Sequence, residues 1–273
     1  MKKLNIGCGH RYSSGWINID FHSESSEVIS HNLLKKLPFS SNSIEAIYSS
    51  HLLEHFERED ALKLIKECYR LLETNGILRI VVPDLEYTCR EYIKILDSLD
   101  SDGDKNKHEW ITIELLDQMV RTQPGGIMAN YWQSIVDKKD ESAIKYIEER
   151  IGVKVKEEVV SYSPRSLSDK IKKINPNLIK TKFNYLYVGM VKKLIPSDLR
   201  QALVDNTPLG EKHKWMYDRY SLGEMFKEVG FKEIKFLDAE KSFISNFSED
   251  YLDINQDGTT YKPGSLYCEA IKP

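Results

Sequence analysis

Apolar and polar positions in the first 97 residues follow two alternating periods. Short apolar runs of strand length begin at residues 4, 16, 27, 44 and 77, and the last of them, ILRIVVPD, is the most continuous. Between the last two runs, EDALKLIKECYRLLE at 59–73 repeats apolar residues every three or four positions. This spacing predicts a helix that is closed at Asn75-Gly76. Strand, helix and strand in this order predict a parallel sheet.

The C-terminal part returns to this alternation after a long interruption. SLGEMFKEVGF at 221–231 predicts a helix closed at Gly230, and KEIKFLDA and SLYCEAIKP predict two further strands. Residues 98–210 lack the strand and helix rhythm and contain four prolines in the stretch 138–214. We therefore expect residues 1–97 and 211–273 to form one α/β core, interrupted by a mostly helical insertion at 98–210.

Composition and charge narrow the function classes. The 273 residues are 41% hydrophobic and 30% charged, which excludes a chain that is disordered throughout. A balance of 39 basic against 42 acidic residues argues against binding to nucleic acid through phosphate neutralisation. Only 138–214 is strongly basic, with 17 basic minus 10 acidic residues giving +7. This segment is expected to bind an anionic acceptor or a membrane surface, or to be a solvated face.

The sequence favours a cytoplasmic protein. MKKLNIGCGHRY reaches glycine, cysteine and histidine before an apolar run of signal-peptide length can form. No window reaches the roughly 18 consecutive apolar residues of a membrane span. The four cysteines are scattered and lack the spacing of a zinc site or a disulfide framework, so we expect reduced thiols.

The first apolar run ends in the glycine motif LNIGCG. Absent side chains at Gly7 and Gly9 let a ligand approach the backbone closely. A dinucleotide motif requires a third glycine opening a helix, but Tyr12 stands there, which disfavours a nicotinamide cofactor. Asp20 follows Gly7 by 13 residues and ends the second run, where a carboxylate accepts hydrogen bonds from ribose or caps a turn. Because 13 residues are few for a crossover helix, we expect the first helix to be reduced or missing.

LNIGCG, GWINID, LPFSSNSIEAIYSSHLLEHF and LIKECYRLLETNGILRIVVPD together resemble the class I S-adenosylmethionine-dependent methyltransferases across residues 4–84. The C-terminal stretches HKWMYDRYSLGEMFKEVGF and YLDINQDGTTYKPGSLYCEAIKP resemble bacterial members associated with surface-polysaccharide biosynthesis. The resemblance implies a Rossmann-like sheet of about seven mostly parallel strands, with the insertion as a cap over its carboxyl edge. It also implies S-adenosyl-L-methionine as the cofactor.

Carried over by position, the resemblance assigns a set of cofactor contacts. The glycine loop would lie under the methionine part, Asp20 would hold the ribose hydroxyls, and residues after the third and fourth strands would line the adenine and the methyl group. The implied contacts are Asn5, Gly7, Cys8, Gly9, Asp20, Phe21, Asn32, Leu33, Ser49, Ser50 and His51. Asn5 and Asn32 stand where acidic residues are usual in the family.

Methyl transfer requires alignment of the acceptor with an already activated sulfonium and removal of a proton. His51 and Asp84 directly follow the fourth and fifth strands, and His213 returns from the insertion. We expect the base among these three and favour His213, since imidazole titrates near neutrality. Their structural alternatives are a packed turn residue, a strand-end cap and a solvated loop residue. The predicted acceptor contacts are Arg121, Tyr131, Trp132, Trp215 and Tyr217.

HLLEH at 51–55 has the His-x-x-Glu-His spacing of a class of zinc peptidases, with the three side chains on one helix face. Its place after a strand at the cofactor end of the sheet favours the methyltransferase interpretation. We expect no metal; if one is bound, His51, Glu54 and His55 are its predicted ligands.

The resemblance implies an O-methyltransferase that acts on a sugar, a nucleotide sugar or a surface-glycan precursor such as capsule or lipopolysaccharide. The alternatives are a non-catalytic module that binds S-adenosylmethionine, and an enzyme that methylates nitrogen or a phosphoryl oxygen of another small molecule. We expect neither nucleic acid nor stable membrane insertion among the partners. The oligomeric state does not follow from the sequence.

Overall fold

The computed structural model describes residues 2–99, 102–154, 187, 190–191, 194 and 210–273. Its centre is a seven-stranded sheet in the order β3-β2-β1-β4-β5-β7-β6. The first five strands in sequence are parallel, and β7 runs antiparallel between β5 and β6. This is the sheet of the class I methyltransferases, so the predicted fold class is confirmed. The strands are β1 (Lys3–Ile6), β2 (Ile17–Asp20), β3 (Val28–Ser30), β4 (Ile44–Ser50), β5 (Leu72–Pro83), β6 (Lys232–Leu237) and β7 (Ser265–Ile271).

Each predicted strand of the core is present. Of the predicted helix features, the absence of a first helix is confirmed and the end of the next helix differs. The short connection between β1 and β2 contains no helix, as the 13-residue spacing predicted. Helix α1 (Arg58–Leu71) ends before Asn75-Gly76, so the predicted stop is wrong. Leu72 already pairs with β4, and Asn75, with φ of +63°, turns the chain within β5.

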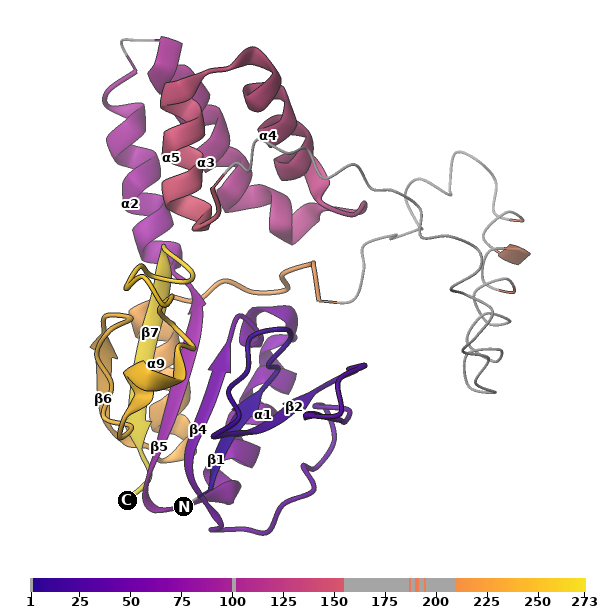
Figure 1. The fold of residues 1–273 in the computed structure, drawn as a ribbon, viewed down its shortest axis with the longest axis vertical. Coiled ribbons are helices and arrows are strands. Elements are labelled where there is room, and N and C mark those ends of the chain that lie inside the picture. Colours follow the sequence, from indigo (N-terminus) through magenta and orange to yellow (C-terminus); the bar gives the residue numbers. More distant parts are fainter. Residues whose placement is uncertain (1, 100–101, 155–186, 188–189, 192–193, 195–209) are drawn as a thin grey trace.

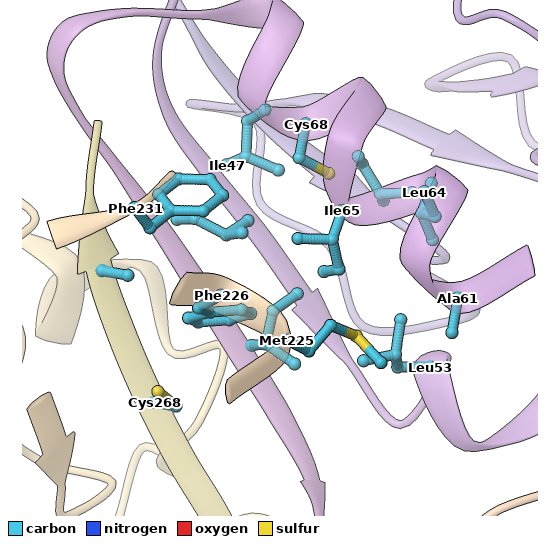
Figure 2. Packing of buried hydrophobic residues seen from close by; sticks show 14 of the residues in the cluster. Ile47, Leu53, Ala61, Leu64, Ile65, Cys68, Met225, Phe226, Phe231 and Cys268 are labelled. Carbon is cyan, nitrogen blue, oxygen red and sulfur yellow. The ribbon is translucent and has the colours of Figure 1, made fainter. Parts of the chain in front are cut away.

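One face of the sheet is covered by α1 and α9 (Arg219–Val229), which ends at Gly230 with φ of +107°, as predicted. Apolar residues of both helices meet β4 and β7 in a continuous core (Figure 2). The labelled side chains there include Ile65 and Cys68 from α1 and Met225 and Phe226 from α9. This packing fixes the carboxyl ends of β1 and β4 relative to one another.

The opposite face is covered by the segment 239–254, which includes the short helix η2 (Phe247–Asp250). Arg79 of β5 is fully buried there and donates to Asp253 Oδ2 at 2.7 Å and Glu269 Oε1 at 2.8 Å. The guanidinium thus joins β5, β7 and the covering segment. Because these charges are withdrawn from water, each depends on the presence of the others.

The remaining helices lie beyond the carboxyl ends of the parallel strands (Figure 1). Helix α2 (Leu85–Leu96) leads away from β5 and packs against α3. Helices α3 (Asp102–Val120), α4 (Gly126–Lys138) and α5 (Glu141–Ile151) form a small bundle with its own apolar core. Helices α3 to α5 of the expected insertion 98–210 thus lie beyond the carboxyl edge, and we call α2 to α5 the helical cap. Most of the expected insertion after residue 154 lies outside the described residues. Among the described residues, no helix combines the length and apolarity needed to cross a bilayer.

Candidate functional site

The glycine loop after β1 is shaped by two positive backbone angles. Gly7 and Gly9 have φ of +68° and +52°, a region that L side chains rarely adopt. The Gly7 N–H donates to the Ile19 carbonyl at 2.8 Å, which holds the loop against β2. A Cβ on Gly7 would meet the Leu52 side chain at 2.7 Å, whereas a Cβ on Gly9 would meet nothing within 4 Å. The backbone at Gly9 is therefore open to a ligand.

Asp20 closes this loop from the end of β2. Its Oδ2 accepts a hydrogen bond from the Gly9 N–H at 2.8 Å. Phe21 beside it is 46% exposed. The next two predicted contacts have structural roles. Asn32 Oδ1 accepts from the Leu34 N–H at 2.9 Å, and Leu33 is buried in the main core.

A first cavity of about 200 Å³ lies over the glycine loop. It includes six of the predicted cofactor contacts, while Ser49 of the same set is buried within β4. Five further lining residues were not predicted, and they come from the loop after Gly9, from β4 and from the segment before β7. The full lining is Asn5, Gly7, Cys8, Gly9, His10, Arg11, Tyr48, Ser50, His51, Tyr261 and Lys262.

A second cavity of about 230 Å³ lies between the sheet and the helical cap. It is lined by the ends of β4 and β5, by α2 to α5, and by the segments around His213 and Pro263. His51 and Lys262 line both cavities, so the two spaces meet at these side chains. The cap contributes Glu114, Gln118, Met128, Arg150 and Ile151.

His51 occupies this junction with an unusual backbone. Its φ of +51° lies in the left-handed region, which costs a residue with a side chain on the order of 1 kcal/mol or more. The His51 N–H donates to the Val81 carbonyl at 2.9 Å, and its Nε2 lies 2.8 Å from Ser265 Oγ. Burial lowers the pKa of the imidazole well below its usual value, and Lys262 lowers it further. The ring is therefore neutral at pH 7 and able to accept a proton.

The other two predicted bases lie in different environments. His213 is 4% exposed and lines only the second cavity. Burial, followed by the neighbouring His55, lowers the pKa of His213 to about 3. Asp84 lines neither cavity among those found in the described chain, and its Oδ1 caps α2 by accepting from the Tyr87 N–H at 3.1 Å. The strand-end cap is thus the role of Asp84.

The five predicted acceptor contacts do not line either of these cavities. Arg121 pairs with Asp117 at 2.5 Å, and Tyr131 and Trp132 pack against the core of the helical bundle. Both rings contact α3, since the Tyr131 hydroxyl donates to the Asn106 carbonyl at 3.2 Å and the Trp132 ring lies 6.4 Å from the Trp110 ring between centroids. Trp215 stacks on Arg58 with the guanidinium carbon 4.6 Å from the ring centroid, and Tyr217 is buried in the main core.

Several lining residues had no usable signal in the sequence. Glu114, Gln118 and Arg150 stand on helices of the insertion, where helical spacing alone does not tell which face meets the sheet. Lys262 stands in the turn before β7, in a stretch that the resemblance covered without assigning a role. Its neighbour Gly264, with φ of +69°, marks the tight turn that brings it to the cavities.

Comparison with known proteins yields one family match. Residues 4–80 match the model of a methyltransferase domain. No curated protein sequence matches the chain. Solved structures with a similar fold include a SAM-dependent methyltransferase from Archaeoglobus fulgidus, 11% identical, with 99% of this chain and 86% of that chain covered and a TM-score of 0.38. A SAM-dependent methyltransferase from Thermotoga maritima is 10% identical, with coverage of 100% and 82% and a TM-score of 0.37.

The matched domain contains the glycine loop, Asp20 and His51. Together with the strand order of the sheet, it identifies the chain as a methyltransferase that depends on S-adenosylmethionine. The cofactor expected from the sequence is thereby confirmed. The structural neighbours, at their low identities and TM-scores, add nothing to the strand order.

Proposed function

We propose that this enzyme transfers the methyl group of S-adenosylmethionine to a hydroxyl oxygen of a sugar, a nucleotide sugar or a surface-glycan precursor held in the second cavity. The carrying observation is that the two cavities share His51 and Lys262. A methyl donor in one cavity and an acceptor in the other would meet at this junction. Such an arrangement aligns the reacting atoms, which can supply roughly 7–11 kcal/mol of the barrier.

The first cavity has the groups that suit the cofactor. The open backbone at Gly9 admits the amino-acid part of the molecule, and Asp20 offers its carboxylate to ribose hydroxyls. Asp20 already orders the loop by accepting from the Gly9 N–H, so part of the site is formed before binding. This preorganisation reduces the entropy that is lost when the cofactor binds.

The second cavity has the groups that suit a polyhydroxyl acceptor. Arg150 donates to both carboxylate oxygens of Glu114, with Nε at 2.5 Å from Oε2 and Nη2 at 2.6 Å from Oε1. The pair holds both side chains in one geometry, and Gln118 adds amide donors and an acceptor beside it. Fixed donors and acceptors of this kind recognise hydroxyl groups. An analogue that lacks a hydroxyl group would leave polar groups of the cavity without a hydrogen-bond partner and would bind more weakly.

The reaction requires little further chemistry from the chain. When bound, S-adenosylmethionine would supply an already activated methyl group, which would pass from its sulfur to the acceptor oxygen. The acceptor hydroxyl must lose its proton, and His51 Nε2 is the atom that would accept it. In this structure the same nitrogen lies 2.8 Å from the hydroxyl oxygen of Ser265. His51 is preferred to His213 because it borders both cavities, and to Asp84 because that carboxylate caps α2.

A methyl-transfer assay with a panel of nucleotide sugars tests the proposal, with the gain of one methyl group in the acceptor as the readout. His51→Gln should lower kcat by roughly 10²–10⁴-fold, because general-base assistance acts in the transition state, and should leave the cofactor Kd nearly unchanged. Asp84→Asn is the matched control, since asparagine also caps helices well. It should retain near-wild-type turnover.

Two outcomes would contradict the proposal in different ways. If His51→Gln turns over at the wild-type rate, the base lies elsewhere. If the wild-type enzyme binds S-adenosylmethionine but methylates no hydroxyl acceptor of the panel, the acceptor class is wrong, and either a nitrogen acceptor or a non-catalytic role takes its place.

A further inference from the structure

Three potential metal ligands from distant parts of the sequence converge beside the junction of the cavities. Glu54 and His55 stand on the short 3-10 helix η1 (Leu53–His55), and His213 stands on the segment that leads from the cap to α9. One ligand atom from each of the three lies within 4.8 Å of the others. Glu54 Oε1 is 3.9 Å from His55 Nε2, and the two imidazole rings are 5.0 Å apart between centroids.

The Glu54 carboxyl lacks the partners that a buried polar group requires. Its residue is 0% exposed, and neither carboxylate oxygen has a hydrogen-bond partner among the described residues. Burial raises the pKa of this carboxyl to about 8. A buried carboxyl without a hydrogen-bond partner destabilises the folded protein. Its position between two imidazoles therefore indicates that a bound ion or molecule contacts it.

The two histidines are held in a form that can ligate a metal. His55 Nδ1 lies 3.0 Å from the Lys212 carbonyl, so it donates its proton there and leaves the Nε2 lone pair toward Glu54. The backbone also fixes the geometry, because the His213 N–H donates to the Gln118 carbonyl at 2.9 Å and the Lys214 N–H to the Glu54 carbonyl at 2.7 Å. Burial lowers the pKa of both imidazoles, which keeps them neutral, as metal binding requires.

We propose that Glu54, His55 and His213 bind a divalent transition-metal ion of the zinc class. Two imidazoles and one carboxylate form a set that zinc prefers, and three protein ligands leave a fourth position for water or a substrate oxygen. His213 also lines the second cavity, so the ion lies at the wall of that cavity. The prediction from HLLEH placed His51 in this set; the 3-10 turn brings His213 to the position instead. The proposal does not depend on the identity of the acceptor.

Neighbouring side chains act against cation binding at this site. Lys262 and Arg121 are close enough for their charges to lower the pKa of His213, and both would repel a cation. Burial lowers the pKa of Lys262, and the nearby carboxylates of Glu54 and Asp253 raise it in part. His51 Nδ1 lies 3.4 Å from Glu54 Oε1, so this third imidazole competes with a metal ion for the carboxylate.

Metal binding to the full chain, without cofactor or acceptor, tests the proposal. The protein is stripped with a chelator and dialysed, Zn²⁺ binding is measured by calorimetry and elemental analysis, and Co²⁺ binding by its visible absorption. We expect one ion per chain and the absorption of a four-coordinate Co²⁺ site. Loss of a side chain that only hydrogen-bonds to a metal ligand typically weakens metal binding roughly 10–100-fold. Because Glu54 and His213 are proposed as ligands themselves, Glu54→Gln and His213→Gln should each weaken Zn²⁺ binding by more than that.

Two further variants make the test specific. His22→Gln removes an exposed histidine outside the cluster and should leave binding unchanged. Lys262→Met removes a neighbouring positive charge and should tighten binding. A stripped wild-type protein that binds neither ion, or a folded Glu54→Gln variant that binds Zn²⁺ like wild type, overturns the proposal. Since the readout is metal binding, its failure leaves the methyl-transfer proposal standing, and failure of methyl transfer leaves this one standing.

Discussion

The backbone at two residues of the glycine loop departs from the ordinary conformations, and each departure has a different physical reason. Gly7 combines a φ of +68° with close approach of the Leu52 side chain. Gly9 has a similar φ, but a Cβ added there meets nothing within 4 Å. The first glycine is therefore required by packing as well as by conformation, while the second leaves its backbone open to the cavity.

Substitution of these two glycines separates packing from conformational strain. Gly7→Ala should destabilise the fold more than Gly9→Ala, since both incur the left-handed cost of about 1–2 kcal/mol but only Gly7→Ala displaces Leu52. Gly9→Ala should instead weaken S-adenosylmethionine binding, because its methyl group enters the cavity. Urea unfolding and calorimetry measure the two effects. Equal loss of stability in both variants would remove the role assigned to Leu52.

At the level of single elements, helix α1 holds the loop 37–41 through a pair of charged side chains. Glu67 Oε1 accepts from the Leu37 N–H at 2.7 Å, and Arg70 donates to Glu67 and to the Phe39 carbonyl. The hydrogen bond from Arg70 is the main cause of a pKa of Glu67 below its usual value. The carboxylate therefore stabilises the folded state above its unfolded pKa, and this contribution is lost as the pH falls through the folded pKa.

Glu67→Gln should lower the free energy of unfolding at pH 7 by about 1–2 kcal/mol, the range for hydrogen bonds to a charged group at a partly buried site. The difference from wild type should shrink as the pH falls below about 4.5, the ordinary pKa of glutamate. Urea unfolding between pH 3 and pH 7 measures this. Asp60→Asn on the same helix is the control, because its pair with the exposed Lys63 is screened by solvent. A pH-independent difference for Glu67→Gln would contradict the assignment.

The buried pair of carboxylates around Arg79 connects three elements and gives a second prediction at this scale. Arg79→Met fits a buried site by volume but leaves Asp253 and Glu269 without their cation. We expect a loss of stability of about 3–5 kcal/mol, measured by urea unfolding. Glu269→Gln keeps an oxygen for Arg79 and should cost less. A loss under about 1 kcal/mol in Arg79→Met would place the carboxylates in their neutral form.

The elements of the core could be predicted from the sequence, but the arrangement of the cap over it could not. Strands such as 44–50 and 77–84 are apolar on both faces, and helix α1 has a clear apolar stripe, so local pattern was sufficient. The residues that line the second cavity are polar positions on cap helices, and polar positions are normally solvated. Glu114 and Arg150 line the cavity because α3 and α5 pack against one another and the two side chains pair between them. Tyr131 and Trp132 pack against the core of the helical bundle and line neither cavity, and the sequence did not indicate this because an aromatic pair on a helix is as suited to packing as to binding sugars.

For the whole molecule, the decisive feature is that the core and the cap each supply one wall of a shared space. The glycine loop, Asp20 and His51 lie at the carboxyl edge of the sheet, where an open α/β sheet binds its ligands. The cap lies over that edge (Figure 1). Its residues Glu114, Gln118 and Arg150 add polar side chains to the second cavity. The basic segment 138–214 begins within this cap, but most of it lies outside the described residues, so its anionic partner stays a prediction.

A crystal structure of the chain with S-adenosylhomocysteine would show whether the cofactor binds at the junction of the two cavities. We expect the homocysteine part over Gly7 and Gly9, the ribose hydroxyls at Asp20, and the sulfur directed toward His51. Such a pose leaves the second cavity free for the acceptor. A ligand bound at another edge of the sheet, or one whose sulfur is directed away from His51, would contradict this expectation.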